Sequence, residues 1–301
     1  MRIVSLLPSA TEIVCALGLS DALVGISHDC DYPPTVAGKP VVSQAVITTT
    51  LSSGEIDRRI RGQLHQGLSV YHLDQAQLGR LEPTLILTQE LCEVCAPSFS
   101  LVEAAARQAG SDSRIVSLEP HGLEDILDNI ALVGELTGRG DDAGSLVADL
   151  RRRIQQVEGA VVGLPRPTVV CVEWLDPLFV AGHWIPEMVE AAGGSDLLGH
   201  PRAHSSVIEW PAIVEADPEV LVLMPCGFDL GRTRDEAELL MDLPGGSELK
   251  AVRSRRVYAT NGTAYFNRPG PRIVDGLEIL AAILHPQTVS WPLPQDGFEK
   301  L

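Results

Sequence analysis

Strand-like apolar segments alternate with helix-like segments along nearly the whole chain, and this alternation constrains the fold more than any other feature. In the first 120 residues, strands are predicted at 3–7, 23–27, 68–73, 84–88 and 114–117, and helices at 9–18, 75–81 and 100–109. In the first helix, Ser9 is the expected N-cap, Glu12 its capping-box partner and Gly18 the stop. Because strands separated by crossover helices pair in parallel, the sequence predicts an α/β fold with a mainly parallel sheet.

A second α/β pattern follows two linking helices predicted at 122–136 and at about 141–158. Its strands are expected at 168–173, 179–181, 220–224 and 256–260, and its helices at 185–192, 234–241 and 271–284. The predicted organisation is an N-terminal lobe at 1–120, linking helices at 121–163, a C-terminal lobe at 164–286 and a loose tail at 287–301. Two lobes on one linker would leave a cleft, which is a favoured place for a ligand.

The charge of the chain excludes some classes of partner. The net charge is −17, with 23 basic and 40 acidic residues, which argues against binding to nucleic acid or to an anionic membrane surface. No run reaches the roughly 18 consecutive apolar residues that a membrane span needs. The chain runs from Met1 into its first strand without a signal-peptide pattern or a lipid-attachment cysteine. We therefore expect a cytoplasmic protein that does not dock on a permease from outside, with its six cysteines as thiols or metal ligands.

Three segments resemble a known family. Residues 3–18, IVSLLPSATEIVCALG, resemble the opening of the class III, helical-backbone substrate-binding proteins of ABC importers, which carry cobalamin, haem and siderophore-bound iron. Residues 30–34 and 265–272 resemble the first-lobe and second-lobe ligand loops of the cobalamin-binding branch. The resemblance implies two three-layer lobes with mainly parallel sheets joined by one long helix, a ligand in the cleft, and no catalysis.

The resemblance also implies roles for individual residues. It assigns ligand contacts to Tyr32 with its neighbour Asp31, and to the loop residues Ala264, Tyr265, Phe266, Asn267 and Arg268. Proteins of this family dock on importers through an acidic residue of each lobe, and Glu55 and Glu209 lie near the corresponding places. A cleft-lining tryptophan of the family is replaced here by the region 204–206. The chain looks most similar to a signal-less branch of the family.

A group of thiols and one imidazole is the candidate metal site. His28 and Cys30 follow one predicted strand, and Cys92 and Cys95 follow another, so all four are expected at the ligand-binding edge of the sheet. They are suited to Zn²⁺ or an Fe–S cluster, and equally to supplying an axial ligand to corrinoid cobalt or haem iron. The alternative is that these cysteines are small buried hydrophobic residues and that His28 binds a backbone carbonyl.

Aromatic residues of the second half are candidates for stacking on a ligand. Trp174 follows a strand and Trp184 precedes a helix, and indole rings suit the flat face of a macrocycle. The alternative is packing around the hinge. Arg268 is expected to pair with an anionic ligand edge or with an acidic group of the protein, whereas His121, His200 and His204 are interpreted as loop residues.

Motifs for other activities are missing from the sequence, which contains no G-x-S-x-G, P-loop or H-E-x-x-H pattern. The first hypothesis is a cytoplasmic protein that binds a small molecule, either a corrinoid such as cobalamin or a related metal chelate. The second is a metal-site protein or enzyme that holds Zn²⁺ or an Fe–S cluster on the same scaffold. A third is an adaptor that senses a ligand, and no sequence feature identifies its partner.

Overall fold

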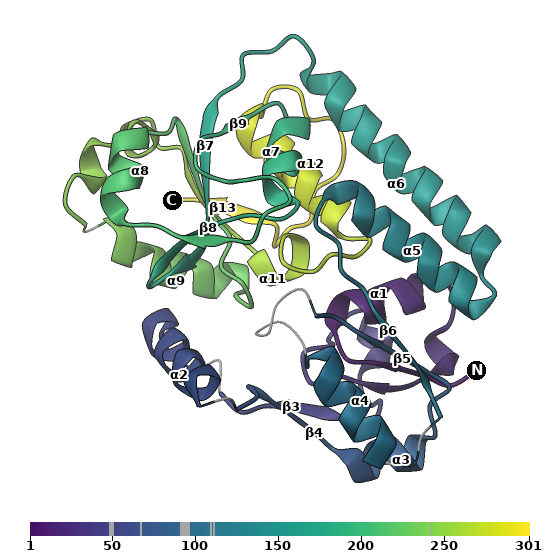
Figure 1. Cartoon of the computed structure of the whole chain (residues 1–301). Coiled ribbons are helices and arrows are strands. Elements are labelled where there is room, and N and C mark those ends of the chain that lie inside the picture. Colours follow the sequence, from purple (N-terminus) through teal and green to yellow (C-terminus); the bar gives the residue numbers. More distant parts are fainter. Residues whose placement is uncertain (48–50, 67, 91–96, 109, 111, 242) are drawn as a thin grey trace. The chain divides into compact units, whose positions relative to one another are not determined.

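The computed structural model describes residues 1–47, 51–66, 68–90, 97–108, 110, 112–241 and 243–301 (Figure 1). The chain divides into two compact units. Unit 1 comprises Met1–Pro120 and Asp125–Val147, and unit 2 comprises His121–Glu124 and Ala148–Leu301. The predicted α/β class is confirmed in both units.

The sheet of unit 1 has four strands in the order β2-β1-β5-β6, and all neighbours are parallel. These strands are β1 (Ile3–Ser5), β2 (Leu23–Ile26), β5 (Leu85–Thr88) and β6 (Arg114–Ser117). The predicted strand at 68–73 does not join this sheet, because β4 (Tyr71–Leu73) pairs antiparallel with β3 (Ser43–Ala45). The helices α1 (Pro8–Ala16), α3 (Gln75–Leu81) and α4 (Phe99–Gln108) pack against these strands. Unit 1 also contains α2 (Ser53–His65) and the short 3₁₀ turns η1 (Ser20–Ala22) and η2 (Pro34–Val36).

The start of α1 differs from the prediction. The helix begins at Pro8, its N-cap is Leu7 without a side-chain cap, and Ser9 and Glu12 are buried. Proline suits the first helical position because its missing N–H has no intrahelical partner there anyway. The predicted stop is in place, because Gly18 follows the helix with φ +71, a conformation that glycine adopts without strain.

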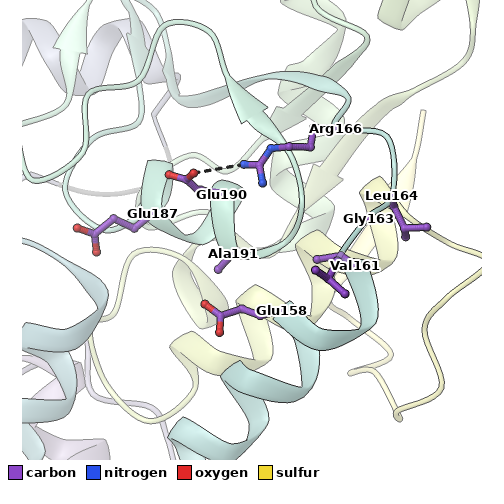
Figure 2. A pocket seen from close by; sticks show the side chains of 9 residues that line it. Glu158, Val161, Gly163, Leu164, Arg166, Glu187, Glu190 and Ala191 are labelled. Atoms are coloured by element: carbon purple, nitrogen blue, oxygen red, sulfur yellow. Dashed lines mark ion pairs between the residues drawn. The ribbon is translucent and has the colours of Figure 1, made fainter.

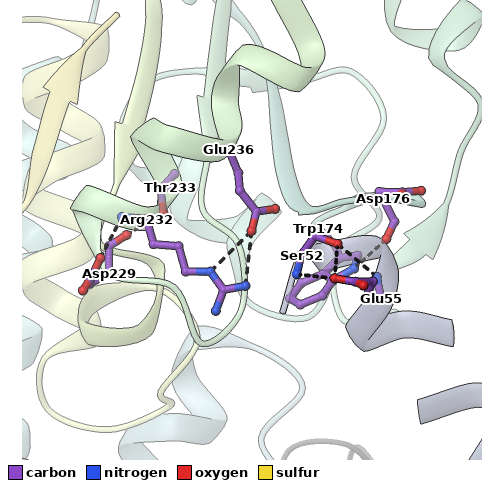
Figure 3. A network of polar contacts seen from close by, with 8 residues as sticks. All are labelled: Ser52, Glu55, Trp174, Asp176, Asp229, Arg232, Thr233 and Glu236. Carbon is purple, nitrogen blue, oxygen red and sulfur yellow. Dashed lines mark hydrogen bonds and ion pairs between the residues drawn. The ribbon is translucent and has the colours of Figure 1, made fainter. Parts of the chain in front are cut away.

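The capping box expected in α1 occurs instead at α2, which the sequence analysis missed. The Ser52 Oγ accepts a hydrogen bond from the Glu55 N–H at 3.4 Å, and the Glu55 carboxylate accepts one from the Ser52 N–H at 3.2 Å (Figure 3). This exchange satisfies two of the backbone groups that a helix N-terminus leaves open.

Two helices connect the units along the chain. They are α5 (Leu123–Thr137) and α6 (Gly140–Val161), and α6 is the long linker, with 22 residues that lead from unit 1 into unit 2. Their antiparallel approach depends on Gly134, since a Cβ at this position would lie 2.3 Å from the Cβ of Ala143.

The sheet of unit 2 follows the order β10-β8-β7-β11-β12-β13, with β9 beside β7. The strands are β7 (Thr168–Leu175), β8 (Leu178–Val180), β9 (Ser195–Asp196), β10 (Ser206–Val207), β11 (Val220–Leu223), β12 (Val257–Thr260) and β13 (Phe298–Lys300). The central strands β7, β11 and β12 are parallel, and β8, β10 and β13 are antiparallel additions. The helices are α7 (Ile185–Ala191), α8 (Trp210–Ala216), α9 (Leu230–Met241), α10 (Lys250–Arg253), α11 (Gly262–Tyr265) and α12 (Ile273–Leu284), with the 3₁₀ turn η3 (Gly246–Glu248).

The last helix is the centre of unit 2. Every residue of α12 except Asp275 is buried, which is typical of a helix surrounded by protein. Within unit 2, Arg153 of α6 forms ion pairs with Asp275 at 2.5 Å and Glu278 at 2.6 Å. This contact attaches the second part of the linking helix to the core of unit 2.

The prediction of a loose C-terminal tail at 287–301 is wrong. Residues 298–300 form β13, which pairs antiparallel with β12 from Tyr258↔Lys300 to Thr260↔Phe298. A polar, proline-rich segment gave no strand pattern, but backbone pairing with β12 and ring contact between Tyr258 and Phe298 at 6.0 Å hold it in place. In the part of the chain that the structure describes, no helix has the length and apolar character needed to cross a bilayer.

Candidate functional site

An aromatic cluster lies where strands of the unit 2 sheet end. Trp174 is near the end of β7, and Phe228 follows β11, with ring centroids 5.2 Å apart. The guanidinium carbon of Arg232 lies 3.5 Å from the centroid of the Phe228 ring. Ligands of parallel α/β sheets bind outside the carboxyl ends of the strands, so the cluster of Trp174, Phe228 and Arg232 occupies the expected ligand edge of unit 2.

Polar contacts orient two members of this cluster, Trp174 and Arg232 (Figure 3). The Trp174 indole N–H donates to the carbonyl of Asp176 at 3.0 Å, so its polar edge is satisfied while the side chain remains partly exposed. Arg232 pairs with Glu236 at 3.2 Å. The sequence analysis predicted Trp174 but missed Phe228 and Arg232, although both closely follow a predicted strand.

The loop at 261–268 is the second part of this edge. Asn261 caps α11 by accepting from the Ala264 N–H at 3.1 Å. Asp296 accepts one hydrogen bond from the Tyr265 hydroxyl at 2.8 Å and another from the Asn261 amide at 2.9 Å. Burial, together with the Asp296 carboxylate, raises the pKa of Tyr265 above its usual value. Tyr265 is therefore a neutral ring in a fixed position.

Several of the predicted contact residues are buried in the structure. The exposed fractions are 7% for Trp184, 6% for Ala264, 7% for Tyr265, 0% for Phe266 and 8% for Arg268. The Trp184 indole N–H donates to the carbonyl of Phe266 at 2.8 Å. This packing supports the loop from inside and leaves the Phe266 ring no surface for a ligand, while Asn267 is partly buried.

Three histidines of unit 2 come together, although the sequence analysis interpreted two of them as loop residues. The rings of His183 and His204 meet edge to face with centroids 5.0 Å apart. Burial, with the neighbouring His204 and His121, lowers the pKa of His183 to about 4. Its Nε2 is buried and has no hydrogen-bond partner among the described residues. No local signal could have shown this, because positions 121, 183 and 204 meet only in the folded chain.

Glu173 of β7 is a partly buried residue that lies close to His183 in the chain. Burial raises its pKa, and the Ser205 hydroxyl, which donates to Glu173 at 2.7 Å, opposes that rise. Ser205 in turn accepts from the Gly182 N–H at 3.1 Å, and Gly182 is required because a Cβ there would lie 2.4 Å from the Ala203 carbonyl oxygen.

Glu173→Gln is expected to stabilise the protein at neutral pH. A carboxyl whose folded pKa is raised favours folding below its unfolded pKa, and this contribution is lost as the pH rises through the folded pKa. Glutamine keeps an acceptor for Ser205 without the buried charge. Urea unfolding should show a gain over wild type at pH 8 that shrinks toward pH 4, and an equal difference at both pH values would contradict the assignment.

The predicted residues of unit 1 lie after β2. Tyr32 is 42% exposed, and Asp31 is also exposed. The thiol sulfur of Cys30 accepts a hydrogen bond from the Thr11 hydroxyl at 3.0 Å. The Nδ1 of His28 lies 3.0 Å from the Ser43 hydroxyl, and its Nε2 lies 3.3 Å from Asp29. The side chains of Cys30 and His28 therefore already contact neighbouring groups of the protein.

The four-residue metal site stays a prediction. Cys92 and Cys95 lie outside the described residues. Within the described ranges, no group of three or more histidine, cysteine, aspartate or glutamate side chains is arranged to hold a metal ion.

A separate pocket of about 380 Å³ lies in unit 2, beside the end of α6 and α7 (Figure 2). Glu158, Glu187 and Glu190 line it, and Arg166 pairs with Glu190 at 3.5 Å. None of the predicted contact residues lines this pocket. It is therefore distinct from the ligand edge described above.

Comparison with known proteins connects these features to one family. Residues 3–264 match the model of the family described as periplasmic binding protein. The chain is 26% identical over 298 residues to the cobalamin-binding protein of Halobacterium salinarum, a match that covers 96% of this chain and 70% of the relative.

Solved structures show the same fold. A periplasmic heme-binding protein from Pseudomonas aeruginosa superposes with a TM-score of 0.75 at 23% identity, covering 100% of this chain and 98% of that one. The periplasmic vitamin B12-binding protein of Vibrio cholerae gives a TM-score of 0.68 at 22% identity, covering 94% and 96%. The class III architecture expected from residues 3–18 is therefore confirmed.

Proposed function

The chain belongs to the periplasmic binding protein family, and we propose that it is a substrate-binding protein for a corrinoid or a related metal chelate. Relatives along nearly the whole chain are named for cobalamin, and proteins of the same fold are named for heme and vitamin B12. The proposal contains binding and no catalytic step.

The aromatic cluster of unit 2 is the observation that carries this proposal. The partly exposed Trp174 indole lies 5.2 Å from the Phe228 ring, and the Arg232 guanidinium lies 3.5 Å from the centroid of the same ring. The face of an indole suits a flat apolar macrocycle, and a guanidinium suits the carboxylate or phosphate groups at its edge. Phe228 is 1% exposed, so its ring supports these two side chains and does not itself contact a ligand. Glu236 holds the guanidinium in place, which reduces the entropy lost when a ligand binds.

A titration of the purified protein tests the proposal. Tryptophan fluorescence and the thermal midpoint would be followed with cyanocobalamin, aquocobinamide and ferric protoporphyrin IX. We expect at least one of these probes to bind, and Trp174→Ala to weaken that binding by at least about tenfold, because truncation of a central tryptophan is costly.

A matched variant controls for general damage. Trp210 lies in α8, where its indole N–H donates to the Pro244 carbonyl at 2.8 Å, and it belongs to none of the loops described above. Trp210→Phe should leave ligand affinity unchanged. Failure of all three probes to quench fluorescence or raise the thermal midpoint would remove this class of ligand.

The location of the protein and its relation to a permease stay predictions. Glu55 and Glu209, the expected docking positions, are both exposed. Fractionation of cells that make the native chain would test the cytoplasmic location, and recovery of the chain in the periplasm or membrane fraction would contradict it.

A further inference from the structure

A basic segment stands out in this acidic chain. Residues 250–256, KAVRSRR, contain one lysine, three arginines and no acidic residue, whereas the whole chain has a net charge of −17. The segment forms α10 and the turn that leads into β12. A local concentration of cations attracts anions even when the net charge of the protein is negative.

This segment lines a pocket of unit 2 with a volume of about 400 Å³. The lining residues are Lys250, Arg253, Ser254 and Arg256, together with Glu219. Sites for small molecules commonly have volumes of about 300–1,000 Å³, so the pocket has room for a small ligand.

The pocket lies at the edge of the sheet opposite to the aromatic cluster. Glu219 directly precedes β11 and Arg256 directly precedes β12, and these two strands are parallel. The pocket is therefore at the amino ends of the strands, whereas Trp174 and Phe228 are at the carboxyl ends. A strand of four residues spans roughly 13 Å, so a ligand in this pocket would not compete with one at the aromatic cluster.

The two arginines of the pocket keep charge available for a ligand. Arg253 is exposed, and its guanidinium has no hydrogen-bond or ion-pair partner among the residues that the structure describes. Arg256 is partly buried, and its Nη2 donates to the Leu284 carbonyl at 3.0 Å. This contact fixes the Arg256 side chain against the end of α12 and does not neutralise its charge.

The carboxylates near the pocket are held by other groups. Asp217 accepts from the Lys250 N–H at 2.8 Å and lies 3.2 Å from the Lys250 Nζ. Glu219 accepts from the Thr168 N–H at 2.8 Å and from the Thr168 hydroxyl at 3.3 Å. Neither carboxylate forms an ion pair with an arginine in the described part of the chain.

We propose that this pocket binds a small multivalent oxoanion through Arg253 and Arg256, with Lys250 as a further cation. The planar fork of a guanidinium donates two parallel hydrogen bonds to phosphate or carboxylate oxygens. Two guanidinium groups around one pocket favour an anion that carries more than one negative charge. The site goes beyond the proposed function and does not depend on it.

Calorimetric titration of the full chain with pyrophosphate and with citrate tests the proposal. The two probes distinguish a phosphoryl anion from a carboxylate, and sodium chloride keeps the ionic strength constant, so that binding must exceed that of chloride. At least one probe should bind with a Kd of about 1 mM or tighter. Absence of binding by both at up to about 10 mM would overturn the proposal.

Variants of the segment then locate the site. Arg253→Glu should weaken binding of the responding anion by at least about tenfold. Arg255→Glu is the matched control, because Arg255 is an exposed neighbour that does not line the pocket and the change in net charge is the same. Equal weakening in the two variants would show a diffuse attraction in place of a site. Glu219→Gln should strengthen binding, because it removes a repelling charge and keeps an acceptor for Thr168.

Chemical modification of arginine with phenylglyoxal maps the site on the unaltered chain. Peptide mass spectrometry should show that the responding anion slows modification of Arg253 and Arg256 and leaves Arg255 reactive. An unchanged rate at Arg253 in the presence of the anion would overturn the assignment.

Discussion

Arg153→Ala is expected to lower the free energy of unfolding by about 3 kcal/mol. This is the low end of the cost of breaking a buried ion pair, because the side chains of Arg153 and Asp275 are 24% and 26% exposed. Arg153 pairs with Asp275 at 2.5 Å and with Glu278 at 2.6 Å. Burial opposes the charge of Arg153, but the hydrogen bonds that it donates to Glu278 and Asp275 raise its pKa above the usual value. Its removal leaves two carboxylates facing each other on the buried helix α12, without the cation that compensates them.

Urea unfolding and the thermal midpoint measure this effect. For a unit of this size, the loss corresponds to a fall of about 6–12 °C in the melting temperature. Arg152→Ala is the matched control on the same helix, because Arg152 and its partner Asp149 are mostly exposed, with side-chain exposures of 65% and 53%. An exposed pair contributes only about 0–1 kcal/mol. Equal losses in the two variants would show that the buried pair does not stabilise unit 2.

Asp296→Ala is expected to lower the free energy of unfolding by about 2–3 kcal/mol, because two hydrogen bonds to a charged acceptor are lost. The Tyr265 hydroxyl and the Asn261 amide both donate to this carboxylate, at 2.8 and 2.9 Å. The loop at 261–268 should loosen as well, which limited proteolysis and the ligand titrations would detect. Glu299→Ala is the matched control on β13, because Glu299 faces Arg234 at the surface, at 3.6 Å.

Titration of the tyrosines provides an independent check on Asp296. A folded-state pKa raised above the unfolded value gives stability that is present at neutral pH and is lost as the pH rises through the folded pKa. Wild type should therefore lose stability above pH 10 as Tyr265 is forced to ionise, since burial and Asp296 both raise its pKa. Asp296→Asn should bring the ionisation of this tyrosine, followed by absorbance at alkaline pH, to a lower pH. An unchanged titration would contradict the contact.

The local sequence pattern was sufficient to predict elements whose bounds are set by hydrophobic periodicity and by helix-ending residues such as glycine. The predicted helix 75–81 and strand 114–117 have the bounds of α3 and β6, and Gly18 ends α1 as predicted. These features depend on neighbours within a few residues, so the sequence carries their signal directly. The resemblance of residues 3–18 likewise indicated the fold, because this segment forms the first strand and the first helix of unit 1.

Contacts between distant residues could not be derived in the same way. The Ser9 cap failed because Pro8 starts α1, and Ser9 is buried in the tertiary structure. The resemblance of residues 265–272 implied a ligand contact for Phe266, but packing removes all of its exposed surface. Trp174 was found as a single residue, whereas its ring partner Phe228 lies more than fifty positions along the chain.

The sequence alone determined the alternation of strands and helices and the parallel sheets, since short-range periodicity encodes these properties. The resemblance of residues 3–18 indicated the family. The tertiary structure alone decided the order of the outer strands, including β13, and the meeting of His183 with His204 and of Tyr265 with Asp296. The physical reason is that burial, pKa and hydrogen-bond partners depend on which distant segments fill the space around a side chain, and no local pattern records that.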